Sequence, residues 1–412
     1  MIRAAPAAPS ARSVAILTAL WGALHLCGAT AEAANPAAPD PTPFLDRRSE
    51  PLEYRGPGRD DAAPADLSEI RIGWFGPSDP AAGDFWAGAA LATGEINASG
   101  GVSGLPIRLV PGWSESPWAG GVSRVARMVY EDNVFAIIGS IDGAATHLAE
   151  QVVAKALVTL ISPGSTDKTV SFAGVPWMFT MLPGDDVQAE ALAAWLSLRR
   201  EARPIALVSA TDHDARVAAA EMRAALERSG LPLAADLQCA PDAAEAATVA
   251  EHVVARAPRA VVLFAAPQAS GRLAASLRGA GYRGAILGGS TLARRSFRGA
   301  AGAAAEGAVV ALPYDPGSDR WTRFARDFAA GNGRDPDFAA GSAYDAVRLV
   351  AEAARRAGPN RARIRDAVRA LSPWEGVLGE VRFDNLGRNQ RPVRLGTLHG
   401  GGVRVSRSEP AP

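Results

Sequence analysis

The chain has 412 residues, of which 48% are hydrophobic and 21% are charged, a composition typical of a soluble globular protein. Its 43 basic and 43 acidic residues cancel, so the charge balance does not favour nucleic acid or an anionic membrane surface as a partner. The length exceeds that of one ordinary hydrophobic core and predicts two domains.

Residues 1–33 have the pattern of a signal peptide for export. Two arginines are followed by an apolar run at 14–26, and the sequence Ala31-Glu32-Ala33 then fits a cleavage site. A membrane-spanning helix needs about 20 apolar residues, so the shorter run favours a cleaved signal over a retained anchor. The mature protein is therefore expected in the periplasm without a membrane span. Cys239 would be its single cysteine, which excludes an internal disulfide.

Residues 34–66 are rich in proline, which prevents a regular helix or a central strand, and we expect a disordered arm there. From residue 70, short apolar runs alternate with helical spacing. The expected strands are 70–75, 107–110, 135–138 and 158–161, and the expected helices are 85–96, 122–130 and 144–156. This alternation predicts βαβ units and a parallel sheet.

The alternation restarts after residues 181–184, which predicts a second α/β lobe and not a continuation of the first sheet. Its expected strands are 205–209, 260–264, 285–287 and 308–312, and its expected helices are 187–198, 217–229, 243–257 and 270–280. Residues 321–371 are predicted to be mainly helical. Two strand-like pieces at 377–383 and 392–398 flank the turn sequence DNLG, which predicts a closing hairpin.

Four motifs in chain order resemble those of type I periplasmic binding proteins, the branched-chain amino-acid receptor class. They are EINASGGVSG at 95–104, IIGS at 137–140, ISPGST at 161–166 and GVLGEVRFD at 376–384. The resemblance implies two doubly wound parallel-sheet lobes joined by a three-segment hinge, with a ligand between them. The expected boundaries are 67–185 with 314–375 for the first lobe, 186–313 with 376–405 for the second, and a tail at 406–412.

The resemblance further implies a solute-binding protein that delivers a small molecule to the permease subunits of an ABC importer, with no cofactor. A periplasmic sensor that signals to a membrane partner is the alternative on the same fold. The sequence contains no nucleophile elbow, Walker loop or HExxH motif, so we do not expect an enzyme. A catalytic interpretation would have to rest on Asp142, His213 and Asp214 meeting across the cleft.

The strand exits of the first lobe provide the first candidate site residues. Small residues after the strand at 158–161 leave backbone N–H groups and hydroxyls available, so Gly164, Ser165 and Thr166 are expected to contact the ligand. The alternative is an ordinary helix cap. The resemblance implies a serine, which holds a ligand carboxylate, where this chain has Gly143. The neighbouring Asp142 is either a ligand contact or the N-cap of the next helix.

In the second lobe, Asp214 and Ser290 stand where the resemblance implies an aromatic and an acidic residue, so the usual clamp for an α-amino acid is incomplete. We therefore expect a bulkier, less zwitterionic ligand. The Asp-His-Asp run at 212–214 does not complete a metal coordination set, and no metal is expected. Trp86 and Trp113 are expected to form flat apolar walls of the cleft, with packing inside the lobe as the alternative.

Overall fold

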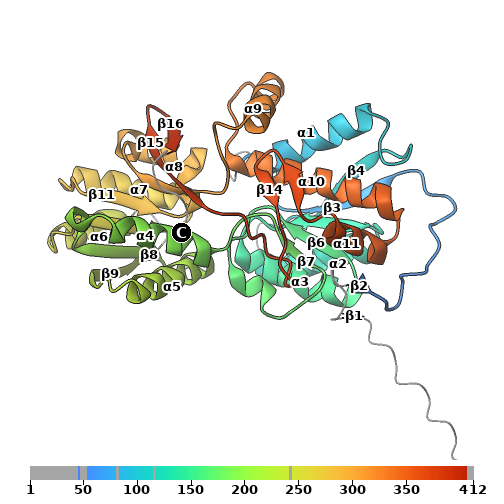
Figure 1. The fold of residues 1–412 in the computed structure, drawn as a ribbon, viewed down its shortest axis with the longest axis horizontal. Helices are drawn as coiled ribbons and strands as arrows, with labels where there is room; N and C mark the ends of the chain where they lie inside the picture. The colour runs from blue at the N-terminus through green and yellow to red at the C-terminus, as the bar shows by residue number, and fades with distance from the viewer. Residues whose placement is uncertain (1–44, 47–52, 80–82, 115–116, 241–243, 406–412) are drawn as a thin grey trace, which may run out of the picture. The chain divides into compact units, whose positions relative to one another are not determined.

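The computed structural model describes residues 45–46, 53–79, 83–114, 117–240 and 244–405. The predicted signal peptide and the predicted tail lie outside these residues. The described residues all belong to one compact unit, and Figure 1 shows its helices and strands. Among the described residues, no helix is both long enough and apolar enough to cross a membrane.

The first sheet has five parallel strands in the order β4-β3-β5-β6-β7. They are β3 (Ile70–Phe75), β4 (Ile107–Pro111), β5 (Ala136–Gly139), β6 (Thr159–Ser162) and β7 (Met178–Thr180). The chain leaves β3 for β4 on one side and later places β5 on the other. Ligands of open α/β sheets bind beyond the carboxyl ends of the strands at such a switch point.

Helices cover both faces of this sheet, which explains why its strands are almost continuously apolar. On β3, Ile72 and Trp74 belong to the core cluster shared with α1 and α10, whereas Phe75 packs in the cluster formed with α2 and α3. The helices of this first lobe are α1 (Phe85–Ala98), α2 (Val122–Tyr130), α3 (Gly143–Ala156), α9 (Asp319–Asn332), α10 (Phe338–Ala357) and α11 (Arg361–Ala370).

The second sheet has the strand order β9-β8-β10-β11-β12-β15-β16, in which β15 and β16 are antiparallel to their neighbours. Its strands are β8 (Ile205–Ala210), β9 (Leu233–Cys239), β10 (Ala260–Phe264), β11 (Ala285–Gly288), β12 (Val309–Leu312), β15 (Arg394–His399) and β16 (Gly402–Val405). The switch point lies between β8 and β10. The two sheets therefore repeat one topology and offer two equivalent strand-end edges.

The second sheet is also covered on both faces. On β8, Ile205 and Leu207 pack with α4 (Asp185–Ser197) and α5 (His213–Arg228). The alternate residues Ala206 and Val208 belong to the cluster that includes α6 (Ala244–Val254), α7 (Pro267–Gly279) and α8 (Arg295–Ala301). The predicted α/β class with two doubly wound lobes is confirmed, whereas the exact lobe boundaries stay a prediction.

The predicted C-terminal hairpin was wrong in its pairing. β13 (Trp374–Gly376) pairs with β14 (Gly379–Val381), while β15 pairs with β12 and β16. Buried Asp345 fixes the turn between β13 and β14, because its carboxylate accepts the N–H groups of Val377 and Leu378 at 2.8 and 3.1 Å. After β14, the chain therefore returns to the second sheet through residues 382–393.

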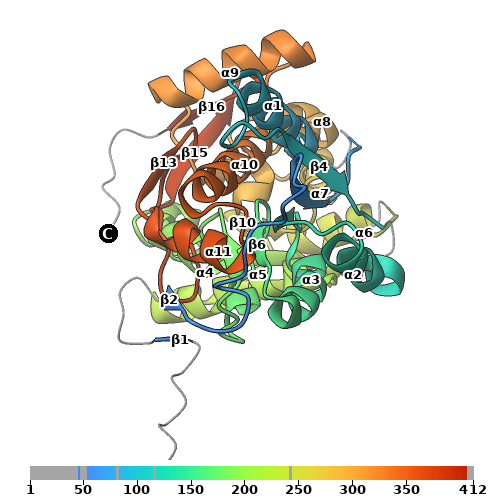
Figure 2. The ribbon, with the colours of Figure 1, turned by 90° about the vertical axis from the view of Figure 1, so that its right-hand side faces the viewer.

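Part of the proline-rich arm, predicted to be disordered, is docked on the first lobe. β2 (Glu53–Tyr54) pairs with β1 (Leu45–Asp46) and lies beside α11 in Figure 2. The backbone N–H of Tyr54 donates to Asp366 at 3.1 Å, and Asn360 Nδ2 donates to the carbonyl of Gly58 at 2.8 Å. Residues 53–66 form no helix, and this described part of the arm docks onto a helix distant in sequence despite its prolines.

Candidate functional site

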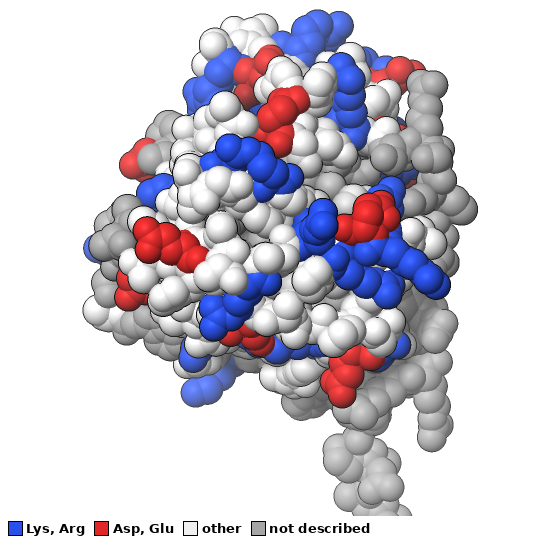
Figure 3. Space-filling model, turned by 90° about the vertical axis from the view of Figure 1, so that its left-hand side faces the viewer, with Lys and Arg blue, Asp and Glu red and all other residues white. Residues whose placement is uncertain are grey.

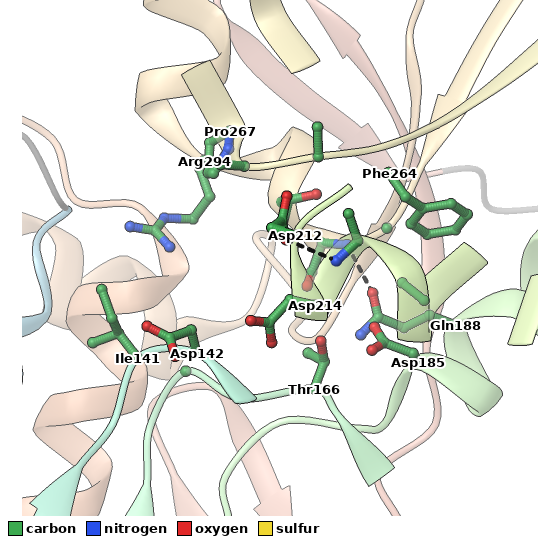
Figure 4. A pocket seen from close by; sticks show the side chains of 18 of the residues that line it. Ile141, Asp142, Thr166, Asp185, Gln188, Asp212, Asp214, Phe264, Pro267 and Arg294 are labelled. Carbon is green, nitrogen blue, oxygen red and sulfur yellow. Dashed lines mark hydrogen bonds between the residues drawn. The ribbon is translucent and has the colours of Figure 1, made fainter. Parts of the chain in front are cut away.

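A cavity of about 310 Å³ opens between the carboxyl ends of the two sheets. Ile141 and Asp142 follow β5, and Gly164 and Thr166 follow β6. From the second lobe, the first turn of α5, the segment after β10 and the segment after β11 close the other side. Figure 4 shows these side chains converging from elements far apart in the sequence. Both switch points therefore face one pocket.

Aspartates cap two helices at this pocket. Asp142 Oδ1 accepts the N–H of Ala145 at 2.7 Å at the start of α3. Asp212 Oδ1 accepts the N–H of Ala215 at 3.0 Å at the start of α5. Both aspartates also line the cavity. Asp142 is thus the N-cap of α3 and also lines the cavity, while its contact with a ligand stays a prediction.

Gly143 lets the two capped helices meet. Its N–H donates to Asp214 Oδ1 at 2.6 Å, which joins the first lobe to the second. A Cβ on Gly143 would lie 2.7 Å from that oxygen and 2.7 Å from Asp167 Cβ. A serine could not occupy this position unless the Asp167 and Asp214 side chains, or the segments that carry them, shifted. The departure from the implied serine therefore has a steric reason, and Gly143 contacts Asp214 instead of lining the cavity.

The pocket carboxyls carry raised pKa values. Burial, followed by the charge of Asp142, raises the pKa of Asp214 to about 7. Burial raises the pKa of Asp185 to about 8, against a hydrogen bond from Thr166 that lowers it. Burial likewise raises the pKa of Asp142. Each shift means that the ionised form is poorly compensated in the cavity as it stands.

A basic side chain of the lining is already paired. Arg294 Nε donates to Asp337 Oδ2 at 3.1 Å, and both side chains are almost fully buried. Its guanidinium lies 4.7 Å from the centre of the Phe85 ring. Arg294 thus reaches from the second lobe into the first and is neutralised there.

Asp167, which lies directly after the pocket residue Thr166, has the opposite electrostatic situation. Its Oδ2 lies 2.8 Å from His213 Nε2 and 3.3 Å from His147 Nε2. Burial alone would raise the pKa of Asp167, but hydrogen bonds from His147, His213 and Thr169 hold it well below its usual range. Hydrogen bonds to Asp167 and Glu150 raise the pKa of His147 to about 9. We name His147, Asp167 and His213 the His–Asp cluster.

The His–Asp cluster is the one group of three among the described residues whose possible metal-binding atoms all lie within 4.8 Å of one another. Its separations of 2.8 and 3.3 Å match hydrogen bonds, and Asp167 Oδ2 serves both rings. The cluster is therefore a hydrogen-bonded contact through Asp167 between α3 and the start of α5. The expectation that the protein holds no metal stays a prediction.

The sequence pattern of one protein family, the periplasmic binding proteins, matches residues 69–402 of this chain. The chain belongs to the periplasmic binding protein family. The Leu/Ile/Val-binding protein homolog 1 of Brucella abortus is 25% identical over 336 residues, which cover 79% of this chain and 88% of that protein. An amino acid binding protein of Pseudomonas aeruginosa is 30% identical over 169 residues, 40% of this chain, and the match spans only 45% of that relative's length.

A solved structure agrees with this assignment. The branched-chain amino acid transporter substrate-binding protein LivJ of Streptococcus pneumoniae, in complex with isoleucine, has a TM-score of 0.74 and 25% identity to this chain. The match covers 82% of this chain and 99% of that one. The predicted resemblance to branched-chain amino-acid receptors is thereby confirmed.

Five of the predicted site residues of this binding protein line the cavity. They are Asp142, Gly164, Thr166, Asp214 and Ser290. Ser165 does not line it, because its side chain is buried away from the cavity. Its hydroxyl has no hydrogen-bond partner among the described residues. Thr166 is not a helix cap, since Asp167 caps the short helix that follows.

The two tryptophans expected as cleft walls lie elsewhere in the binding protein. Trp86 packs edge-on against Trp74, with ring centres 5.6 Å apart, and Trp113 packs on Phe75 at 5.3 Å. Neither lines the cavity. Both rings are held by the buried strand β3, so packing within the first lobe outweighs exposure at the rim.

Several lining residues were not anticipated from the sequence. Phe264 ends β10, Phe338 begins α10, and Asp185 and Gln188 lie on the first turn of α4. Phe264 could have been found, because it is the last residue of a predicted strand and therefore lies at a carboxyl end. The other residues come from helix starts that line the pocket only once the two lobes face each other.

Proposed function

We propose that this periplasmic binding protein captures a small organic molecule in the cavity and delivers it to an ABC importer without changing it chemically. The observation that carries the proposal is the cavity itself, whose walls come from the strand ends of both sheets. Membership of the family supports export to the periplasm. The named relatives, a Leu/Ile/Val-binding protein homolog and an isoleucine-bound transporter protein, support a ligand of amino-acid size.

Asp142, Gly164, Thr166, Asp214 and Ser290 are proposed as ligand contacts, because all five line the cavity. They offer two carboxylates, two hydroxyls and the backbone of a glycine packed closely against Ile141, which suits recognition by a few directed hydrogen bonds within apolar walls.

The described conformation supports a clamshell that has closed. Lys168 in the first lobe lies 2.8 Å from Glu221 on α5, and the Asp167–His213 contact joins the same two lobes. On another side of the cavity, Arg295 on α8 lies 2.8 Å from Asp84 in the first lobe. A ligand could enter only after such contacts separate, so the connections near residues 184 and 313 and across 382–393 would act as hinges.

Solution scattering tests the proposal. A bound ligand should reduce the radius of gyration of the ligand-free protein, and the same ligand should raise the melting temperature. The complex should then stimulate the ATPase activity of an ABC importer reconstituted in vesicles. Closure without any such stimulation would leave the sensing role as the function, and binding without closure would contradict the clamshell.

A further inference from the structure

The cavity concentrates negative charge. Four aspartates line it, namely Asp142, Asp185, Asp212 and Asp214. Arg294 is the one lysine or arginine among the described lining residues, and Asp337 already pairs with it at 3.1 Å. On the outer face drawn in Figure 3, by contrast, acidic and basic side chains are interspersed. The excess of carboxylates therefore distinguishes the pocket from this face of the molecule.

Three backbone donors that an anionic ligand could use are occupied by the protein itself. The N-termini of helices are the usual place for a bound carboxylate, because their N–H groups and dipole attract negative charge. Here Asp142 accepts from Ala145 at the start of α3, and Asp214 accepts from Gly143 at the same place. The N–H of Ser290 donates to Gln188 Oε1 at 2.7 Å. A ligand carboxylate would meet carboxylates where it needs donors.

Asp142, Asp185 and Asp214 accept hydrogen bonds from the chain, but no described lysine or arginine pairs with the pocket carboxylates. The side chain of Asp185 is buried, with 7% of the residue exposed, and Asp212 Oδ2 is buried with no hydrogen-bond partner among the described residues. Burial raises the pKa of Asp214 to about 7 and that of Asp185 to about 8. Bringing a positive charge into the cavity would relieve both the desolvation and the mutual repulsion.

The arrangement suits an organic cation better than a metal ion. Among the described residues, the one group of three acidic, histidine or cysteine side chains with ligand atoms within 4.8 Å is the His–Asp cluster, which does not line the cavity. The pocket aspartates are therefore too dispersed to share one small ion, which needs oxygens at about 2.0–2.6 Å. Ile141, Phe264 and Phe338 provide apolar and aromatic walls, which suit a hydrocarbon body and a cation over a ring.

We propose that the ligand is a small organic amine, with an apolar body and one or more ammonium groups bound by Asp142, Asp185 and Asp214, and with no carboxylate. The proposal rests on the proposed function, because it names the chemical class that the same cavity would take. It separates this protein from relatives named for leucine, isoleucine and valine, whose ligands carry both charges.

Matched probes isolate the charge of the ligand. Three amines are compared with acids of the same shape: 3-methylbutan-1-amine with 4-methylpentanoate, 2-phenylethylamine with 3-phenylpropanoate, and 1,4-diaminobutane with hexanedioate. Leucine is the zwitterion that shares a skeleton with the first pair, and calcium chloride alone tests a bare cation. Calorimetry and thermal shift at pH 7.5 report binding, and scattering reports closure.

The expected result is that at least one amine binds at least tenfold more tightly than its acid partner and more tightly than leucine. Tighter binding of an acid or of leucine would overturn the amine proposal while leaving the proposed function intact. Stabilisation by calcium alone, with no amine effect, would overturn it in favour of a metal ligand. If no amine, acid or amino acid produces binding or closure, the proposed function fails as well.

Variants locate the effect in the cavity. Asp214→Asn and Asp185→Asn should each weaken amine binding at least tenfold, while the ligand-free protein keeps or raises its melting temperature because a poorly compensated charge is removed. Asp327→Asn is the matched control, since this exposed aspartate lies on α9 and pairs with Arg326 at 2.9 Å. The proposal would be overturned if both pocket variants bound the amine as tightly as the Asp327→Asn control does.

Discussion

Asp167 and Asp185 are both buried aspartates, and they lie close together because the N–H of Asp185 donates to the carbonyl of Thr166 at 2.8 Å. Their carboxyls nevertheless have opposite electrostatic environments. Histidines and Thr169 hold the pKa of Asp167 well below its usual range, whereas burial raises the pKa of Asp185 to about 8. Burial is common to both, so the partners make the difference.

This contrast separates a contact whose charges are paired within the fold from a cavity whose carboxylates have no cation partner among the described residues. The His–Asp cluster satisfies Asp167 within the chain and joins α3 to the start of α5. The pocket aspartates receive no comparable cation from the described residues. Proteins accept such locally unfavourable groups at sites of function, where the missing partner comes from outside.

Asp167→Ala should produce the largest effect, because it removes the acceptor shared by two rings and by Thr169. Breaking a buried, hydrogen-bonded ion pair from one side costs about 3–5 kcal/mol. We expect that loss in the free energy of unfolding, measured with urea at pH 7. Asp327→Ala, at an exposed position, should change it by less than about 0.5 kcal/mol. A loss below 1 kcal/mol in Asp167→Ala would show that the cluster is not the stabilising contact described here.

Gly143→Ser tests whether α3 and α5 need their close approach. The new Cβ would lie 2.7 Å from both Asp214 Oδ1 and Asp167 Cβ, and we expect α3 and α5 to move apart to relieve the clash. Overpacking of this kind costs about 1–3 kcal/mol, and scattering should show a larger radius of gyration. Gly94→Ser is the matched control, because nothing lies within 4 Å of a Cβ at that helical glycine. Equal behaviour of the two variants would remove the steric reason given for Gly143.

Asp214→Asn should raise stability, in contrast to Asp167→Ala. The pKa of Asp214 is about 7 in the folded protein, against about 3.9 in an unfolded chain. The folded state therefore holds its proton more tightly, and wild-type stability falls as the pH rises from about 4 to 7. The amide cannot ionise, so the variant should exceed wild type by about 1–2 kcal/mol at pH 8 and by much less at pH 5. Urea unfolding at both pH values checks this; lower stability at pH 8 would contradict it.

Much of the fold could be predicted because its signals are local. The strand at residues 70–75 and the helix at 122–130 were predicted with the bounds that the structure shows, since apolar runs and breakers mark both. β9 and β16 were missed because both are edge strands without a continuous apolar run. In β9 only two side chains are buried, and in β16 none is. The docking of residues 53–61 depends on Asn360 and Asp366, which lie about 300 residues away, and no local pattern carries it.

The site was predictable to the extent that parallel strands end at one edge. Asp142, Thr166 and Asp214 follow strand ends, and the structure places all three on the cavity. The contact of Gly143 with Asp214 joins residues 71 positions apart on different lobes. Such pairings depend on how the lobes face each other, as does the neutralisation of Arg294 by Asp337. The prediction that two tryptophans form cleft walls was wrong, because the size of an aromatic ring favours burial but does not indicate where in the molecule the ring is buried.

The smallest expected effect concerns the pH dependence of the His–Asp cluster. Hydrogen bonds to Asp167 and Glu150 raise the pKa of His147 to about 9, against about 6.5 in an unfolded chain. The stabilisation from protonated His147 is therefore fully present below about pH 6.5 and is lost as the pH rises through about 9. The His147 side chain is 30% exposed, so solvent screening reduces the effect to about 1 kcal/mol.

His147→Gln keeps a side chain that can donate to Asp167 but cannot gain a proton. Wild type should lose about 1 kcal/mol more than this variant between pH 7 and 9.5, as measured by urea unfolding at each pH. His252→Gln on α6 provides the matched control, because this residue lies outside the cluster and should follow wild type. If wild type and His147→Gln lose stability in parallel, the charge on His147 does not stabilise the contact between the lobes. The low pKa of Asp167 would then have to rest on His213 and Thr169 alone.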